Sequence, residues 1–332
     1  MPLTAVVDVV EKTQIEHSAD AEKTAPQHQL ALKLGCDEAK RTTLQRRYMA
    51  YPLSVSPIFR LEENGSAASS TKSASSTTSV ERAYLYRMNT SPGLLAGDRI
   101  GMSLQLADNA QLYLADQSAT KVHAMPQVDT QATVNYDIRV GDRATLEFLP
   151  EPLILFADAT LTQTTEITLH PTAGLSLGEI ILPGRLARGE VYEFRKYFSR
   201  IRVKSPEGPV WFTEAMKLQG KENSFVKSEL FASGLVMGTL ILVLPESVAT
   251  SDALNRLSAG IESFAAALGP VNGSANGSSH GQVDLASSIL PGGRGLFVRA
   301  IASATRDIQS CFREAVNSVR TVRQQVTLPY SL

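Results

Sequence analysis

Cysteine is scarce in this sequence: only Cys36 and Cys311 occur among its 332 residues. Two thiols are too few for a disulfide framework or a thiolate metal cluster, and such a chain suits a reducing compartment. The first 40 residues also lack the apolar core of a secretory signal. The sequence therefore predicts a cytoplasmic protein.

An excess of charge of either sign is also missing. Lysine and arginine total 32 and aspartate and glutamate total 33, which gives a formal net charge of -1. A chain without a basic field has no long-range attraction for nucleic acid or for an anionic membrane surface. We therefore expect protein partners, and neither nucleic acid nor a membrane.

Long hydrophobic runs are absent as well. The one candidate for a membrane span, Leu230 to Leu244, contains Gly234 and Gly238. It is shorter than the roughly 20 residues that a membrane-spanning helix requires. We interpret this stretch as a buried pair of strands.

Three segments have few apolar side chains: residues 1–45, the Ser/Thr/Ala tract 64–79 and the Gly/Ser/Asn run 271–281. Segments of this kind cannot bury enough apolar surface to offset the entropy that ordering would cost. We expect a flexible N-terminal extension over residues 1–45. A single domain over residues 46–332 would follow, with the other two segments as inserts.

The rest of the chain consists mostly of short runs with the alternation of β-strands. Examples are Tyr84–Met88, Ile100–Leu106 and Ala132–Val140. This period of two indicates strands that bury one face. Turn sequences such as Ala107–Ala110 and Val140–Arg143 separate the runs. Many short strands joined by tight turns predict a mainly β fold of packed sheets.

Two segments in the C-terminal half have a helical period instead. One begins near Ser251 or Asp252, either of which can cap a helix, and its apolar residues are Leu254, Leu257, Ile261, Phe264, Ala265 and Leu268. The other runs from Ala304 to Val322 and carries Cys311 on its apolar side. Both patterns predict amphipathic helices. The arginines of the second helix are either solvated or part of a docking surface.

The loop Pro92–Asp98 brings an acid to the start of a predicted strand. Pro92 and Gly93 favour a turn, and Gly97 can adopt a positive φ, which places Asp98 at the rim of a sheet. Asp98 either bonds backbone N–H groups of its own turn or lines a polar path for a hydrated divalent ion. The loop has no GxxxxGK[ST] pattern, which argues against phosphate binding.

A second polar segment, Asp116–His123, contains Ser118 and Lys121. A serine and lysine pair can belong to a hydrolase, but the remaining base and oxyanion-hole groups cannot be identified here. We favour a loop whose side chains bond their own backbone.

Two further segments carry glutamates in apolar surroundings. In Leu146–Pro152, proline on either side of Glu151 predicts an edge, a bulge or a sharp corner. Glu147 and Glu151 then either share a cavity or face solvent. Glu179 lies in the apolar run Leu175–Leu182. It is either a functional carboxylate or one half of an ion pair with an arginine that follows it, Arg185 or Arg188.

The five histidines show no metal-ligand spacing. They form no HxH, HxxxH or HxxE pairing, and they are His17, His28, His123, His170 and His280. The sequence therefore predicts no tight metal site.

In their order and spacing, segments 91–99, 116–121, 146–152 and 179–190 resemble the urease accessory protein family UreD, also called UreH. Several ordered motifs are more specific than any one of them. The resemblance implies a two-layered, mostly β scaffold with a pair of helices. It also implies a nonenzymatic role in urease maturation.

The same resemblance implies a cargo and partners. These would be nickel in transit, with no tightly bound cofactor, a UreF-like protein, a UreG-like GTPase and the urease apoprotein. Carried over by motif, the candidates for an internal nickel path are Asp98, Glu179, Glu147, Glu151 and Glu190. Those expected to position loops or pair with these acids are Lys121, Arg185 and Arg188.

Two other functions remain open from the residues alone. The chain can be a structural adaptor that links urease to its GTPase complex and never touches metal. It can also be a hydrolytic or isomerising enzyme with paired carboxylates, such as Glu147 and Glu179, as acid and base.

Overall fold

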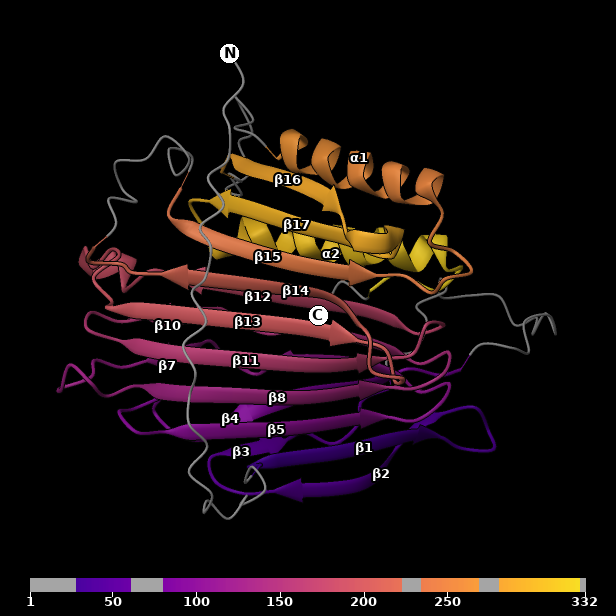
Figure 1. Ribbon diagram of the computed structural model, residues 1–332, viewed down its shortest axis with the longest axis horizontal. Coiled ribbons are helices and arrows are strands. Elements are labelled where there is room, and N and C mark those ends of the chain that lie inside the picture. Colours follow the sequence, from indigo (N-terminus) through magenta and orange to yellow (C-terminus); the bar gives the residue numbers. More distant parts are fainter. Residues whose placement is uncertain (1–27, 61–79, 223–233, 269–280, 329–332) are drawn as a thin grey trace, which may run out of the picture.

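The computed structural model describes residues 28–60, 80–222, 234–268 and 281–328, and these form two β-sheets and two α-helices (Figure 1). The first sheet has seven strands, in the order β14 (Val210–Leu218), β13 (Lys196–Lys204), β11 (Thr160–Leu169), β8 (Ala132–Val140), β5 (Arg99–Leu106), β1 (Leu30–Cys36) and β2 (Thr42–Met49). The predicted mainly β, two-layered fold is confirmed.

The second sheet has ten strands. Eight of them follow the order β16 (Val283–Ile289), β17 (Gly295–Ala302), β15 (Val236–Val243), β12 (Gly174–Leu182), β9 (Thr145–Leu149), β6 (Gln111–Asp116), β4 (Ala83–Asn89) and β3 (Leu53–Val55). The two short strands β10 (Leu153–Leu155) and β7 (Thr120–Val122) branch from β12. Among the described residues, 3-10 turns cover Leu186–Arg188 and Pro291–Gly293.

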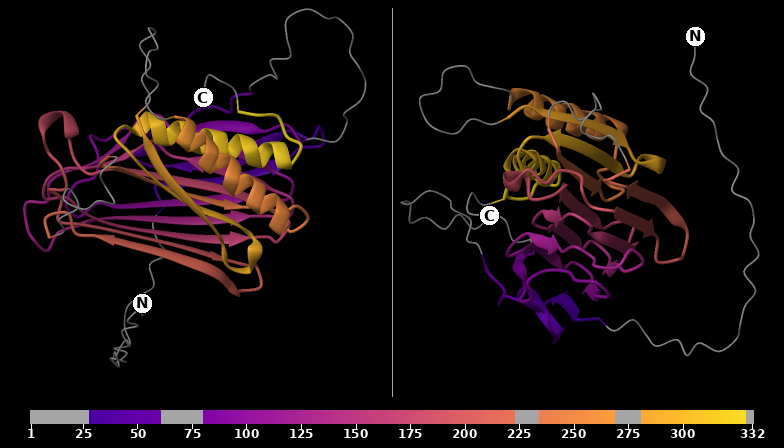
Figure 2. Two further views of the ribbon diagram at one scale, coloured as in Figure 1. Left: turned by 90° about the horizontal axis from the view of Figure 1, so that it is seen from above. Right: turned by 90° about the vertical axis from the view of Figure 1, so that its left-hand side faces the viewer.

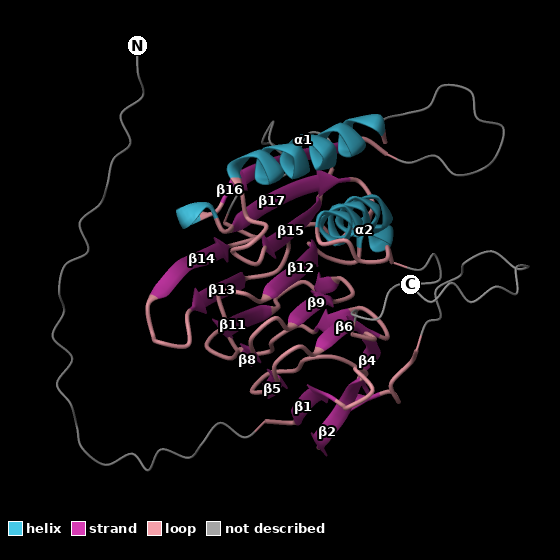
Figure 3. Cartoon of the chain, turned by 90° about the vertical axis from the view of Figure 1, so that its right-hand side faces the viewer, coloured by secondary structure: helices cyan, strands magenta, loops and turns pink. Residues whose placement is uncertain are grey.

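Strands that follow one another in the chain alternate between the two sheets, from β4 in the second to β5 in the first, then to β6, β8, β9, β11 and β12. In this coiled part the neighbouring strands of each sheet pair in parallel, as β5 does with β8 and β6 with β9. Each coil of the chain therefore adds one strand to each layer, and the two layers are seen end-on in Figure 3. The predicted strands Tyr84–Met88, Ile100–Leu106 and Ala132–Val140 belong to this coiled part.

The tight turns carry the chain across from one sheet to the other. Residues 107–110 lead from β5 to β6, and residues 141–144 lead from β8 to β9. Asn109 and Arg143 adopt positive φ values of 63° and 51° there. Neighbouring turns also bond one another, since the Asn109 N–H donates to the Asp142 carbonyl at 2.8 Å. Turns of successive coils therefore stack as the strands do.

Inward-facing side chains of the two sheets form the main core. Along β8 the alternate residues Ala132, Val134, Ile138 and Val140 are buried, and Leu146 and Phe148 of β9 meet them from the other sheet. Side chains alternate across a strand, so the opposite face of β8 points outward.

Helices α1 (Ser251–Ala267) and α2 (Thr305–Val322) lie against the outer face of the second sheet (Figures 2 and 3). The N-cap of α1 is Thr250, whose hydroxyl accepts from the Ala253 N–H at 3.2 Å, and not the predicted Ser251 or Asp252. Gly238 of β15 lets α2 approach closely, because a Cβ atom there would lie 2.5 Å from Ile308 Cγ2. Strands β12 and β15 are consequently covered on both faces.

The N-terminal boundary differs from the prediction. Residues 30–36 and 42–49 form β1 and β2, which belong to the first sheet, so the expected extension over residues 1–45 overlaps two strands. Leu30, Leu32 and Leu34 are buried, and this short alternation inside a polar region is the signal that marks β1. Residues 1–27, 64–79 and 271–280 lie outside the described residues.

The apolar stretch Leu230–Leu244 also differs. Its described part, from residue 234, forms the single buried strand β15 and not a pair of strands. Among the described residues, no helix is long and apolar enough to cross a membrane.

Candidate functional site: a polar cavity between the sheets

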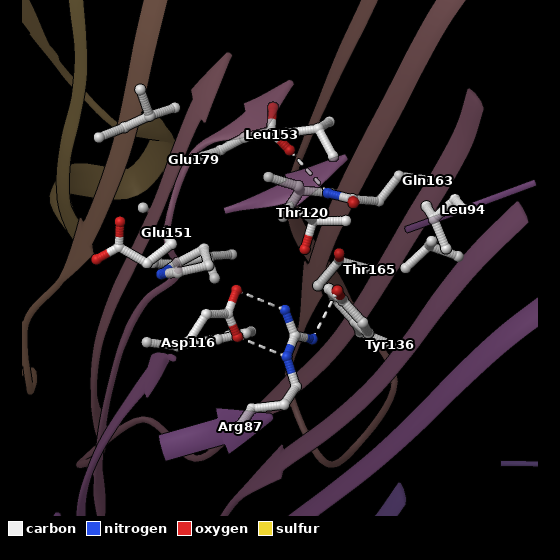
Figure 4. A pocket seen from close by; sticks show the side chains of 17 residues that line it. Arg87, Leu94, Asp116, Thr120, Tyr136, Glu151, Leu153, Gln163, Thr165 and Glu179 are labelled. Atoms are coloured by element: carbon white, nitrogen blue, oxygen red, sulfur yellow. Dashed lines mark hydrogen bonds and ion pairs between the residues drawn. The ribbon is translucent and has the colours of Figure 1, made fainter. Parts of the chain in front are cut away.

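A cavity lies between the two sheets (Figure 4). Its walls come from β8, β11 and β13 of the first sheet and from β4, β6, β7, β9, β10 and β12 of the second. Its polar lining residues are Arg87, Asp116, Thr120, Tyr136, Glu151, Gln163, Thr165 and Glu179. An interior of this kind needs every polar group to be paired, because an unpaired one would cost free energy.

Glu179 of β12 points from the second sheet toward the first. It shares an inward face with Leu175 and Leu177, while Ile180 faces the helices. The carboxylate oxygen Oε2 accepts from Gln163 Nε2 at 2.7 Å, from the Tyr197 hydroxyl at 2.7 Å and from Ser199 Oγ at 3.4 Å.

Burial raises the pKa of the Glu179 carboxyl above its ordinary value, and the bonds from Tyr197 and Ser199 and the charge of Arg299 oppose the rise. Desolvation disfavours the charged form of a carboxyl group. A nearby cation would favour that charged form.

Arg87 and Asp116 form a second polar group in the same cavity. They face each other on the parallel strands β4 and β6. Arg87 Nε lies 2.7 Å from Asp116 Oδ1 and Nη2 lies 2.9 Å from Oδ2, while Nη1 donates to the Tyr136 hydroxyl at 2.7 Å. Burial opposes the charge of Arg87, but the Asp116 carboxylate and the Tyr136 hydroxyl raise its pKa above the ordinary value.

Glu151 stands at the edge of the cavity, on the corner between β9 and β10. Pro150 and Pro152 flank it, and the predicted corner is where the structure ends one strand and begins the next. Gln309 of α2 donates to Glu151 Oε2 at 3.2 Å. Partial burial raises the pKa of this carboxyl.

Glu147 does not share this cavity with Glu151. Its carboxylate accepts from Arg320 Nε of α2 at 2.9 Å, and Arg82 Nη1 lies 3.1 Å from its Oε2. Burial alone would raise the pKa of Glu147, but Arg82 and Arg320 hold it below the ordinary value. The structure therefore places Glu147 in a buried ion pair that joins β9 to α2, outside the cavity lining.

Asp98 and Lys121 also lie outside the cavity lining. Asp98 Oδ2 accepts from the Leu95 N–H at 2.8 Å, which is the ordinary turn contact. Leu94 of the same loop does line the cavity, and its N–H donates to the Lys121 carbonyl at 2.8 Å. The side chain of Lys121 is exposed. The loop thus contributes an apolar wall and not its acid.

Glu190, Arg185 and Arg188 belong to a different corner. Arg185 Nε lies 2.5 Å from Glu190 Oε2, and the Ala157 N–H donates to Glu190 Oε1. The Arg185 guanidinium also stacks on the Phe156 ring, 4.5 Å from its centroid. Arg188 is exposed in the 3-10 turn. Here the ion-pair alternative holds, with Glu190 and not Glu179 as the partner of Arg185.

Several polar groups of the cavity and its surroundings were not among the predicted site residues, including Arg87, Asp116, Tyr136, Gln163 and Tyr197. Each occupies an inward position on a strand whose inward residues are mostly apolar. On β11, for example, Gln163 shares its face with the buried residues Leu161 and Ile167. A polar residue at an apolar position of a period-two pattern was the available signal.

Metal ligands are dispersed in the described ranges. No three His, Cys, Asp or Glu side chains there come close enough together to hold a metal ion. The carboxylates that line the cavity, Asp116, Glu151 and Glu179, come from three different segments. The cavity therefore presents isolated carboxylates and not a cluster of metal ligands in the part of the chain that the structure describes.

The fold and the cavity together define a coiled, two-sheet β protein with isolated carboxylates in its interior. Comparison with known proteins identifies the family: the model of the UreD urease accessory protein matches residues 27–330. The chain belongs to the UreD family of urease accessory proteins.

Individual relatives agree. The chain is 44% identical to the urease accessory protein UreD of Trichodesmium erythraeum (strain IMS101) over 301 residues, which cover 91% of this chain and 97% of the relative. It is 29% identical over 230 residues to UreD of Haloarcula marismortui, covering 69% of each chain. A UreD of Actinobacillus pleuropneumoniae is 40% identical over 124 residues, covering 37% of this chain and 46% of the relative. Urease accessory proteins are not enzymes, and the family has its role in urease maturation.

Proposed function

We propose that this chain passes nickel to the urease apoprotein, in a GTP-dependent cytoplasmic complex with UreF-like and UreG-like proteins. Family membership supports the maturation role. Nickel is the cargo of this process and not a resident cofactor. In this proposal the cavity between the sheets is part of the route that the ion takes.

The observation that carries this proposal is the position of Glu179. It is a buried carboxyl that lines an internal cavity, and its bonds come from the neutral donors Gln163, Tyr197 and Ser199, with no cation among them. A carboxyl group whose hydrogen-bond donors are all neutral holds no guanidinium or ammonium group that a passing cation would have to displace. Asp116 and Glu151 line the same cavity.

The dispersed carboxylates favour transit over storage. An ion that is passed onward must not be held strongly at any point, and tight sites for transition metals gather several nitrogen, sulfur or carboxylate ligands. In this proposal Glu179, Glu151 and Asp116 line the path. Asp98, Glu147 and Glu190, whose contacts are with backbone or arginine, hold loops and elements in place.

Reconstitution tests the maturation role and the partners. Urease apoprotein, nickel, GTP and the UreF-like and UreG-like proteins are combined with or without this chain, and nickel bound per urease is measured. We expect omission of the chain to lower nickel incorporation at least tenfold, and a nonhydrolysable GTP analogue to do the same. Equal incorporation without the chain would contradict the proposed role.

Substitution of Glu179 tests the path. Glu179→Gln keeps the shape of the side chain and its capacity to accept hydrogen bonds but removes the charge. We expect the complex to assemble while nickel incorporation falls. Glu166→Gln is the matched control, because Glu166 lies on the first sheet at the half-exposed face of β11, outside the cavity lining. A structural adaptor that never touches metal would tolerate both changes equally.

A further inference from the structure

A second, smaller cavity adjoins the first. The two share six lining residues: Arg87, Leu94, Asp116, Thr120, Val134 and Tyr136. From this common wall the first cavity extends to Gln163 and Glu179, and the second extends to Asn89 and to Ser118, which is exposed. The two cavities therefore meet at one group of side chains.

The centre of that group is the Arg87–Asp116 ion pair, which Figure 4 shows together with Tyr136. Both Asp116 oxygens are occupied by Arg87, at 2.7 and 2.9 Å. Arg87 is 8% exposed and Asp116 is 6% exposed. A cation that moves between the cavities thus meets a buried guanidinium, and the carboxylate beside it is already engaged.

Arg87 has other partners that do not depend on Asp116. Its Nη1 donates to the Tyr136 hydroxyl at 2.7 Å, and its guanidinium lies 5.2 Å from the ring centroids of both Tyr136 and Phe148. Aromatic faces attract a guanidinium, and a hydroxyl satisfies one of its N–H groups. Arg87 can therefore give up Asp116 and still remain held by Tyr136 of the first sheet and Phe148 of the second.

We infer that the Arg87–Asp116 pair is a charged partition between the two cavities, which a divalent cation passes by taking the Asp116 carboxylate from Arg87. This inference rests on the proposed nickel path. A monovalent ion gains only half of the Coulomb attraction that a divalent ion gains from the same carboxylate at the same distance, so it competes less well with the guanidinium. Arg87 is in this view the residue that sets the charge requirement for passage.

A charged partition differs from an ordinary buried ion pair in the expected effect of neutralising one or both of its residues. If Asp116 is neutralised, the positive charge of Arg87 has no counter-charge and repels the cargo. If both are neutralised, the repulsion disappears. A partition thus predicts that loss of Arg87 relieves the defect caused by loss of Asp116.

The test compares nickel per urease after co-expression with this chain as wild type, Asp116→Asn, and Arg87→Met with Asp116→Asn. Pull-down of the accessory complex and thermal unfolding of the purified chain are measured in parallel. We expect Asp116→Asn to lower nickel at least tenfold in assembled complexes, and the double variant to recover at least threefold over it. Wild-type nickel per urease with Asp116→Asn would overturn the partition. So would a double variant whose nickel per urease is no higher than that of Asp116→Asn.

Arg87→Lys gives a second test if neutralised variants fold poorly. Lysine keeps the charge but lacks the planar fork that bonds both carboxylate oxygens. We expect the nickel concentration for half-maximal urease activation to fall at least twofold, and an unchanged or higher value would contradict the inference.

Glu179→Gln distinguishes a failure of the partition from a failure of the proposed nickel path. If Glu179→Gln lowers nickel per urease but substitutions at Arg87 and Asp116 have no effect, the partition is contradicted and the path is retained. If Glu179→Gln does not lower nickel per urease, the path itself is contradicted.

Discussion

Arg320 of α2 and Glu147 of β9 form a bidentate ion pair in the interior, with Nε and Oε1 2.9 Å apart and both side chains 2% exposed. Arg82 adds a third charged group to the same carboxylate. The pair fixes the C-terminal helix to the coiled sheets through residues 173 positions apart in the chain.

Arg320→Met tests how much this ion pair contributes to the free energy of unfolding. Removing Arg320 breaks a buried ion pair and leaves Arg82 as the partner of Glu147. Breaking a buried pair typically costs about 3–5 kcal/mol of unfolding free energy, and the remaining contact with Arg82 places the expected loss at the lower end of that range. Urea titration of the purified chain measures the change. Arg256→Met, in an exposed pair on α1, is the control and should leave the unfolding free energy nearly unchanged. Equal stability of the two variants would contradict the structural role of Glu147.

Gly238→Ala tests the contact between α2 and the second sheet. The added Cβ would lie 2.5 Å from Ile308 Cγ2 and 2.8 Å from Phe312 Cζ. Overpacking of this kind costs about 1–3 kcal/mol. Gly260→Ala in α1 is the matched control, since a Cβ there meets open space. We expect it to stabilise the chain by about 0.5–1 kcal/mol, because alanine is the better helix former.

The pH dependence of stability tests the environment of Glu179. Its raised pKa means that the folded chain binds this proton more tightly than the unfolded chain does. Linkage then predicts that the wild type loses stability as pH rises from the ordinary glutamate pKa through the raised one. Glu179→Gln lacks this titration, so the stability difference between variant and wild type should grow in favour of glutamine from pH 4.5 to 7.5, roughly one titration window. A difference that stays constant over this range contradicts the assignment.

Much of the fold can be predicted from the sequence because the apolar periodicities that mark its strands and helices are local. The alternation in Ala132–Val140 marks β8, and the apolar stripe from Ala304 to Val322 marks α2. The coiling of the chain cannot be predicted in this way. A turn such as Ala107–Ala110 has the same composition whether it folds a hairpin or carries the chain to the other sheet, and here it does the latter.

The site is partly predictable because some of its residues stand out in their local sequence. Glu179 is conspicuous as an acid within an apolar run, and the structure brings it into the cavity. Glu147 has the same local signature, but its partner Arg320 is distant in sequence and only the packing of α2 reveals it. Arg87 and Asp116 are brought together by the parallel pairing of β4 and β6, which no local pattern specifies.

The most direct test of the account is the nickel content of urease matured with Glu179→Gln, compared with Glu166→Gln, at equal recovery of the accessory complex. A lost charge in the path should lower nickel per urease about tenfold, which corresponds to a barrier about 1.4 kcal/mol higher. The control should match the wild type. Equal nickel in both variants would contradict the claim that the ion passes through the cavity.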